Sequence, residues 1–140
     1  MYKQNNLLKI CLGIRTKNGK AHISELWFYQ VLFFLKQKGV SKPSLFIQKV
    51  LSRLRPPIGL QNKQRGASKI KIPAPIPLKQ QFLKALRWIF EGAKKRGRGN
   101  ITPQIFADEV YSIARGKNSY SFKQRKEFLR AVLDSRAFMR

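Results

Sequence analysis

The sequence predicts a mainly α-helical fold, a bundle of about six helices from which one basic β-hairpin protrudes. Apolar residues recur at helical spacing in six segments, one stretch between them alternates with a period of two, and Gly or Pro residues separate the segments. The chain has 140 residues, of which 43% are hydrophobic, so it is long and apolar enough for one domain, residues 1–140, with a core of its own.

Two helices open the predicted bundle, over residues 4–17 and 21–38, with a basic turn at residues 17–20 between them. In the second helix the apolar residues cover most of the circumference, which predicts that it is buried on several sides at the centre of the core. These residues are Ile23, Leu26, Trp27, Phe28, Val31, Leu32, Phe33, Phe34 and Leu35. Gly39 is predicted to end this helix.

A third helix is predicted over residues 42–54, with Ser41 as its cap and Pro56-Pro57 as its stop. Its predicted inward residues are Leu45, Phe46, Val50, Leu51 and Leu54. The hairpin follows at residues 57–76, because Lys and Ile alternate over residues 69–72 and residues 62–66 carry turn-forming residues. This hairpin has a basic tip.

The last three helices are predicted over residues 77–96, 103–115 and 121–138, opened by Pro77, by Thr102-Pro103 and by Ser121. Trp88 lies at the edge of an apolar face, and its spacing favours core packing over stacking on a base. The residues predicted to pack include Leu78, Phe82, Ala85, Leu86, Ile89, Ala93, Ile105, Phe106, Val110, Ile113, Phe122, Leu129, Val132 and Leu133.

The charge of the chain points to a polyanionic partner. Lys and Arg number 30 against 6 Asp and Glu, the formal net charge is +24, and residues 26–90 contain no carboxylate. Ion pairs within that stretch cannot neutralise it, whereas nucleic acid releases counterions on meeting such a surface. Because the cations sit on a projecting hairpin and the helix after it, we expect folded RNA recognised by its shape. The predicted RNA-binding residues are Lys17, Lys20, Arg55, Lys63, Arg65, Lys69, Lys71, Lys84, Arg87, Lys94, Lys95, Arg96, Arg98, Lys123, Arg125 and Lys126.

Residue types used in catalysis are scarce, and the sequence predicts no enzyme, metal site or cofactor. His22 is the only histidine, and Cys11 is the only cysteine. Asp108 and Glu109 are adjacent, so on a helix they point about 100° apart and are interpreted as partners for nearby cations. Two alternatives stay open at this point, a helical DNA-binding regulator and a cationic membrane-active protein. The apolar run at residues 26–35 is too short for a membrane span, which needs about 20 residues.

Several short sequence motifs resemble those of the small-subunit ribosomal protein seven family, also called the universal S-seven family. Gly-Ala-Ser at residues 66–68 and Ile-Pro at residues 72–73 resemble the family's motif in the hairpin. Ala-Leu-Arg-Trp-Ile at residues 85–89 and Lys-Arg-Gly at residues 95–97 resemble the family's motif in the helix that follows the hairpin. Looser likeness extends over almost the whole chain.

The resemblance implies a helical bundle with a protruding hairpin that binds the 3′ major domain of small-subunit rRNA and organises assembly of the head. It also implies neighbouring head proteins as partners, messenger RNA and exit-site transfer RNA nearby, and neither a membrane nor a second copy as partner. The sequence departs from the family pattern at Gln80-Gln81, Ala67 and Ile70, so contacts made there are not carried over.

Two further expectations concern the setting of the protein. The chain is expected to lack the family's basic N-terminal arm and C-terminal tail, because it starts near the first helix and ends within the last one. Many Phe, Lys and Ile residues and no visible targeting lead favour an organelle-encoded member, in a mitochondrial ribosome. A plastid or cytoplasmic ribosome is the alternative.

Overall fold

The computed structural model describes residues 21–116 and 120–135, and the predicted helix over residues 4–17 lies outside them. The described part contains five helices and one two-stranded antiparallel hairpin, which confirms the mainly α fold class. In chain order the elements are α2 (Ala21–Gln37), α3 (Pro43–Leu54), β1 (Ile58–Arg65), β2 (Ser68–Pro75), α4 (Leu78–Arg96), α5 (Pro103–Ala114) and α6 (Tyr120–Ser135).

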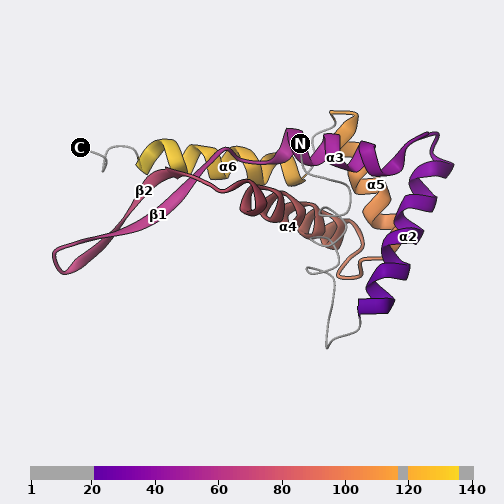
Figure 1. Cartoon of the computed structure of the whole chain (residues 1–140), viewed down its shortest axis with the longest axis horizontal. Helices are drawn as coiled ribbons and strands as arrows, with labels where there is room; N and C mark the ends of the chain where they lie inside the picture. Colours follow the sequence, from indigo (N-terminus) through magenta and orange to yellow (C-terminus); the bar gives the residue numbers. More distant parts are fainter. Residues whose placement is uncertain (1–20, 117–119, 136–140) are drawn as a thin grey trace.

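The molecule is elongated, with the hairpin projecting at one end and α2 lying at the other (Figure 1). Helices α4 and α6 run side by side between these ends. At the far end α2 packs on α5 and α3, while α6 also contacts both strands at the base of the hairpin. The arm is therefore anchored to the body mainly through α6.

The core is built by buried residues of α2, α3, α4 and α5. Three rings meet where the partly buried Trp27 packs against this core: Trp27 lies 5.8 Å from Phe90 and 5.2 Å from Phe106, and the latter two are 4.9 Å apart, centroid to centroid. Trp88 is buried and meets the ring of Phe128 edge-on at 5.6 Å, so its predicted core packing is confirmed. Aromatic pairs of this kind add to the hydrophobic gain of burial.

Helix starts agree with the sequence at α4 and α5 and disagree at α3 and α6. α4 begins directly after Pro77, and the Thr102 hydroxyl accepts a hydrogen bond from the backbone N–H of Ile105 at 3.3 Å, which caps α5. The prediction of Ser41 as a cap is wrong. Lys42 occupies the N-cap position without a side-chain hydrogen bond, and α3 opens on Pro43, whose ring already fixes a helical φ and which has no N–H to cap.

Several large apolar residues predicted to lie inward are exposed instead. On α2 they lie on the side away from α3 and α5, so the prediction that this helix is buried on several sides is wrong. A continuous apolar circumference indicates burial only if neighbours surround the helix, and the described residues place neighbours on one side. The residues that were predicted to lie inward and are exposed are Ile23, Leu26, Phe33, Leu45, Leu78 and Leu133.

The hairpin is a regular ladder with a short turn. Its register pairs Ile58 with Pro75 at the base and Arg65 with Ser68 at the tip, which leaves a two-residue loop at residues 66–67. Gly66 has φ +63° and Ala67 does not have a positive φ, the pattern of a type II′ turn with Gly first. The predicted turn at residues 62–66 is therefore too early, because all but Gly66 continue β1.

A buried carboxylate joins the three C-terminal helices. Glu109 on α5 is 3% exposed and accepts hydrogen bonds from Arg96 Nε on α4 at 3.1 Å and from the Ser121 hydroxyl on α6 at 3.3 Å. Ser121 is thus a buried contact rather than the predicted cap, since α6 already begins at Tyr120. Asp108 pairs with Lys38 at 2.6 Å, so both acids are partners of cations, as the sequence predicts.

Candidate nucleic-acid interface

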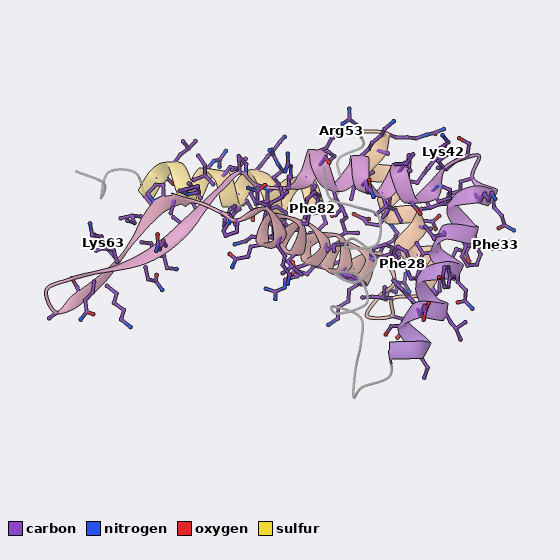
Figure 2. All side chains as sticks on the ribbon, viewed as in Figure 1. Phe28, Phe33, Lys42, Arg53, Lys63 and Phe82 are labelled. Carbon is purple, nitrogen blue, oxygen red and sulfur yellow. The ribbon has the colours of Figure 1, made fainter. Side chains whose placement is uncertain are left out.

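The hairpin presents cations on both of its faces. Side chains of paired residues point to the same face, and the face alternates from one pair to the next. Lys69 and Lys71 therefore lie on one face, together with their cross-strand partners Gln64 and Asn62. Lys63 lies on the other face, beside its partner Ile70. Lys63 lies far from the helical body (Figure 2). The outer half of the arm is exposed, so a polyanion can reach its charges from either side.

Four cations of α4 form a stripe along its length. At 100° per residue, Lys84, Arg87, Lys94 and Lys95 fall within an arc of about 100°, and Glu91 is the one acid among them. Arg87, Lys94 and Lys95 are exposed. We call these four residues the α4 stripe, which spans roughly 17 Å at the helical rise of 1.5 Å per residue.

Two hollows extend this stripe at its ends. The first, of about 370 Å³, lies where the hairpin base meets α4 and is lined by Gly59, Leu60, Ile76, Gln80, Leu83, Lys84 and Arg87. The second, of about 360 Å³, is lined by Glu91, Lys94, Lys95, Arg98, Gly99 and Tyr120. Together they make one basic track from the hairpin base to the loop after α4.

Two aromatic residues of α6 support the stripe, and sequence reasoning missed both. Lys84 Nζ lies 3.9 Å from the ring centroid of Phe128, and Lys95 Nζ lies 4.0 Å from that of Tyr120. Burial, with a smaller contribution from the charge of Arg87, lowers the pKa of Lys84 below its usual 10.5. The sequence does show the eight-residue spacing that puts both rings on one side of α6. It does not show that this side packs against α4.

The loop after α4 holds Arg98 in a conformation that favours glycine. Its φ is +53°, and it is the one non-glycine residue with a positive φ in the described ranges. The neighbouring Gly99 N–H donates to the Lys94 carbonyl at 2.9 Å and closes the helix end. A left-handed conformation costs an L-residue roughly 1–2 kcal/mol. The guanidinium is thus placed beside the second hollow despite a backbone penalty.

Other predicted cations are occupied elsewhere. Arg96 points away from the α4 stripe, where its Nε bonds to Glu109 and its Nη2 donates to the Ser112 hydroxyl at 3.1 Å. Arg55 is half-buried and its Nη1 donates to Gln81 Oε1 at 3.4 Å. These two arginines hold helices together in the free protein.

The remaining predicted cations fall into two groups. Lys123 and Lys126 are exposed on α6, and Arg125 there has a buried Nε without a hydrogen-bond partner among the described residues. Lys17 and Lys20 lie outside the described residues, and Arg65 is described only as the last residue of β1. The geometry therefore brings together the α4 stripe and Arg98, whereas the cations of the outer hairpin project away from the helical body.

Metal-ligand clusters and long apolar helices are both absent from residues 21–116 and 120–135. In these ranges no group of three His, Cys, Asp or Glu side chains is placed to hold a metal ion. Nor is any helix there long and apolar enough to cross a membrane.

The fold and the track together define a class: a small helical protein with a projecting hairpin arm and a basic face along α4. Sequence comparison then gives the family. The family model described as ribosomal protein S7p/S5e matches residues 2–136, so the chain belongs to this family of structural ribosomal proteins and is not an enzyme. The resemblance inferred from the hairpin and helix motifs is confirmed.

Three of the relatives that it matches are bacterial proteins with low sequence identity. The chain is 27% identical over 137 residues to a protein named small ribosomal subunit protein uS7 of Blochmanniella floridana, covering 96% of this chain and 85% of the relative. Proteins of the same name from Colwellia psychrerythraea and Alcanivorax borkumensis are 27% and 28% identical. The alignments cover 96% and 86% of this chain, and 85% and 76% of those relatives.

Proposed function

We propose that this chain, a ribosomal protein of the small subunit, binds the 3′ major domain of small-subunit rRNA through the outer hairpin, the α4 stripe and Arg98. One observation carries the proposal: Lys84, Arg87, Lys94 and Lys95 share one face of α4 with the single acid Glu91, between a hollow at the hairpin base and a hollow at Arg98. Phosphates along such a track release counterions, and each Lys or Arg that meets one adds to affinity and to its salt dependence.

The two-sided arm supports a role in organising the head of the subunit. Because Lys63 and the pair Lys69 and Lys71 face opposite ways, the arm contacts one RNA segment on each face. A protein that joins two segments stabilises their arrangement and favours assembly around it. From the family resemblance we further propose neighbouring head proteins as partners and a place beside messenger RNA and exit-site transfer RNA.

A matched pair of variants tests the RNA-binding surface. The test variant is Arg87→Gln, Lys94→Gln, Lys95→Gln on the α4 stripe, and the control is Lys36→Gln, Lys42→Gln, Lys49→Gln, three exposed lysines of α2 and α3 and the loop between them. Both lose the same charge. Binding to an rRNA fragment of the 3′ major domain is measured against salt concentration.

The test variant is expected to weaken binding at least tenfold and to reduce the slope of log affinity against log salt by about 2–3, roughly one for each phosphate that is no longer neutralised. The control is expected to change little. Equal losses in the two variants refute the proposed surface. Duplex DNA as competitor separates the alternative of a DNA-binding regulator, which predicts that duplex displaces the rRNA.

The mitochondrial ribosome is our proposed location, and it rests on composition alone. Sedimentation of an organelle extract tests it: the protein should travel with the small ribosomal subunit of mitochondria. Its recovery with plastid or cytoplasmic subunits instead excludes this location while leaving the RNA-binding proposal intact.

A further inference from the structure

Helix α2 carries an exposed apolar face on its outer side. Ile23 is 59% exposed, Leu26 50%, Tyr29 52% and Phe33 58%. At 100° per residue these four residues, together with Gln30 and Gln37, fall within an arc of about 120° from Ile23 to Gln37, and the same arc contains His22 in the first turn of the helix. We call these six residues the α2 outer face. Phe33 points away from the helical body (Figure 2).

This face has the opposite character to the RNA-binding track. None of its six residues is charged, in a chain with 30 Lys and Arg among 140 residues. It also lies at the other end of the molecule from the arm (Figure 1). Phosphates require cations, so RNA is a poor occupant, whereas a contiguous exposed apolar patch is typical of a protein contact.

The charges at the rim of the face select the kind of protein. Lys36 on the last turn of α2 and Lys42 just before α3 are exposed, and neither forms an ion pair within the described residues. Lys38 between them is already paired with Asp108 at 2.6 Å. The one acid of α2 itself, Glu25, lies near the opposite end of the helix, where its carboxylate accepts a hydrogen bond from the Tyr29 hydroxyl at 3.5 Å. One end of the face therefore has an unbalanced positive rim.

That rim argues against a second copy of this chain as occupant. Each copy carries a formal charge of +24, so two copies meeting at this face would bring like charges together. An occupant with carboxylates beside its apolar residues would instead meet Lys36 and Lys42 favourably.

We propose that the α2 outer face docks an amphipathic helix of a second protein, with apolar residues at i, i+3 or i+4 and i+7 and carboxylates flanking one end. Helices pack by setting such apolar ridges into the grooves of the partner, and Leu26 and Phe33, two turns apart, offer matching ridges. The protein would then hold RNA at one end and another protein at the other. This inference does not depend on the RNA-binding proposal.

Designed helical peptides of about 18 residues, long enough to cover the face at 1.5 Å per residue, are the probes for the test. One peptide has a Leu face flanked by Glu, a second has the same Leu face flanked by Lys, and a third has Glu but no Leu face. Binding to the full chain is measured by fluorescence anisotropy at about 0.3 M salt, which screens non-specific attraction. The first peptide alone is expected to bind saturably.

The matched variants keep the charge of the chain unchanged. Leu26→Gln with Phe33→Gln should weaken binding of the first peptide at least tenfold, because buried apolar anchors carry most of such an interface. Leu133→Gln on α6, a residue as exposed as Phe33 at 58%, should have no effect. Equal binding by all three peptides, or by both variants, overturns the proposal.

A photo-crosslinking side chain in place of Phe33 gives a second readout in assembled small subunits. Crosslinks to a protein segment with the proposed apolar and acidic pattern support the inference. Crosslinks to rRNA, to residues 1–20 of the same chain or to another copy of it overturn it.

Discussion

The buried Glu109 allows a sharp test of how the helices that carry the track are held together. Its side chain is 4% exposed, whereas that of Arg96 is 42% exposed. Truncating either partner therefore has unequal consequences. Arg96→Ala leaves a buried carboxylate with the Ser121 hydroxyl as its one remaining side-chain donor among the residues that the structure describes. Loss of Glu109 instead frees a guanidinium that already reaches water.

The expected magnitudes follow from this asymmetry. Breaking a fully buried pair costs 3–5 kcal/mol, and the exposure of Arg96 reduces this to roughly 2–3 kcal/mol for Arg96→Ala. Glu109→Gln keeps the volume and an acceptor for Ser121, so it should cost about 1 kcal/mol. The double variant removes the buried charge together with its partner. It should be more stable than Arg96→Ala alone, by about 1 kcal/mol.

Thermal unfolding followed by circular dichroism measures these differences, at moderate salt to screen the repulsion within a chain of charge +24. For a chain of this size each 1 kcal/mol shifts Tm by roughly 3–5 °C. The double variant should thus unfold a few degrees above Arg96→Ala. If the two single losses simply add, the buried charge is not what Arg96 compensates, and the reasoning is refuted.

Three further predictions concern the track and the arm. Arg98→Gly should stabilise the free protein by about 1 kcal/mol, because it relieves the left-handed backbone, yet weaken rRNA binding; unfolding and binding assays on one preparation check both signs. Lys84→Met should alter the pH dependence of stability: the folded pKa of Lys84 is lowered, so the unfolded state binds more protons, and the wild type should gain stability relative to the variant as pH rises toward 10.5. A pH series of unfolding free energies that runs parallel for the two proteins contradicts this. Gly66→Val places a β-branched residue at φ +63° and should loosen the hairpin tip without changing Tm of the body, measured as faster amide exchange confined to residues near the turn.

Periodicity and punctuation in the sequence predict most of the described fold. Pro77, Thr102-Pro103 and the alternating residues 69–72 place α4, α5 and the hairpin because each acts through its own backbone. What the sequence could not predict depends on neighbours. Whether Phe33 is buried depends on how many helices surround α2, and local spacing contains no information about that.

The candidate site shows the same division. Sequence spacing alone places Lys84, Arg87, Lys94 and Lys95 on one helix face. It could not distinguish Arg96, one residue further, whose partner Glu109 lies on another helix. Nor could it show that Phe128 would pack beneath Lys84, since tertiary packing of α6 on α4 creates that arrangement.

The outer half of the hairpin has a consequence for the cost of binding. A free two-stranded ribbon is only marginally stable in water, and residues 61–64 and 68–69 are exposed, beyond the reach of buried apolar packing. We therefore expect that RNA bound on both sides would complete its ordering, and that part of the interaction energy would be spent on this rigidity. Such a hairpin would become rigid only when ligand contacts both of its faces. Its affinity should therefore depend on both faces being occupied at the same time.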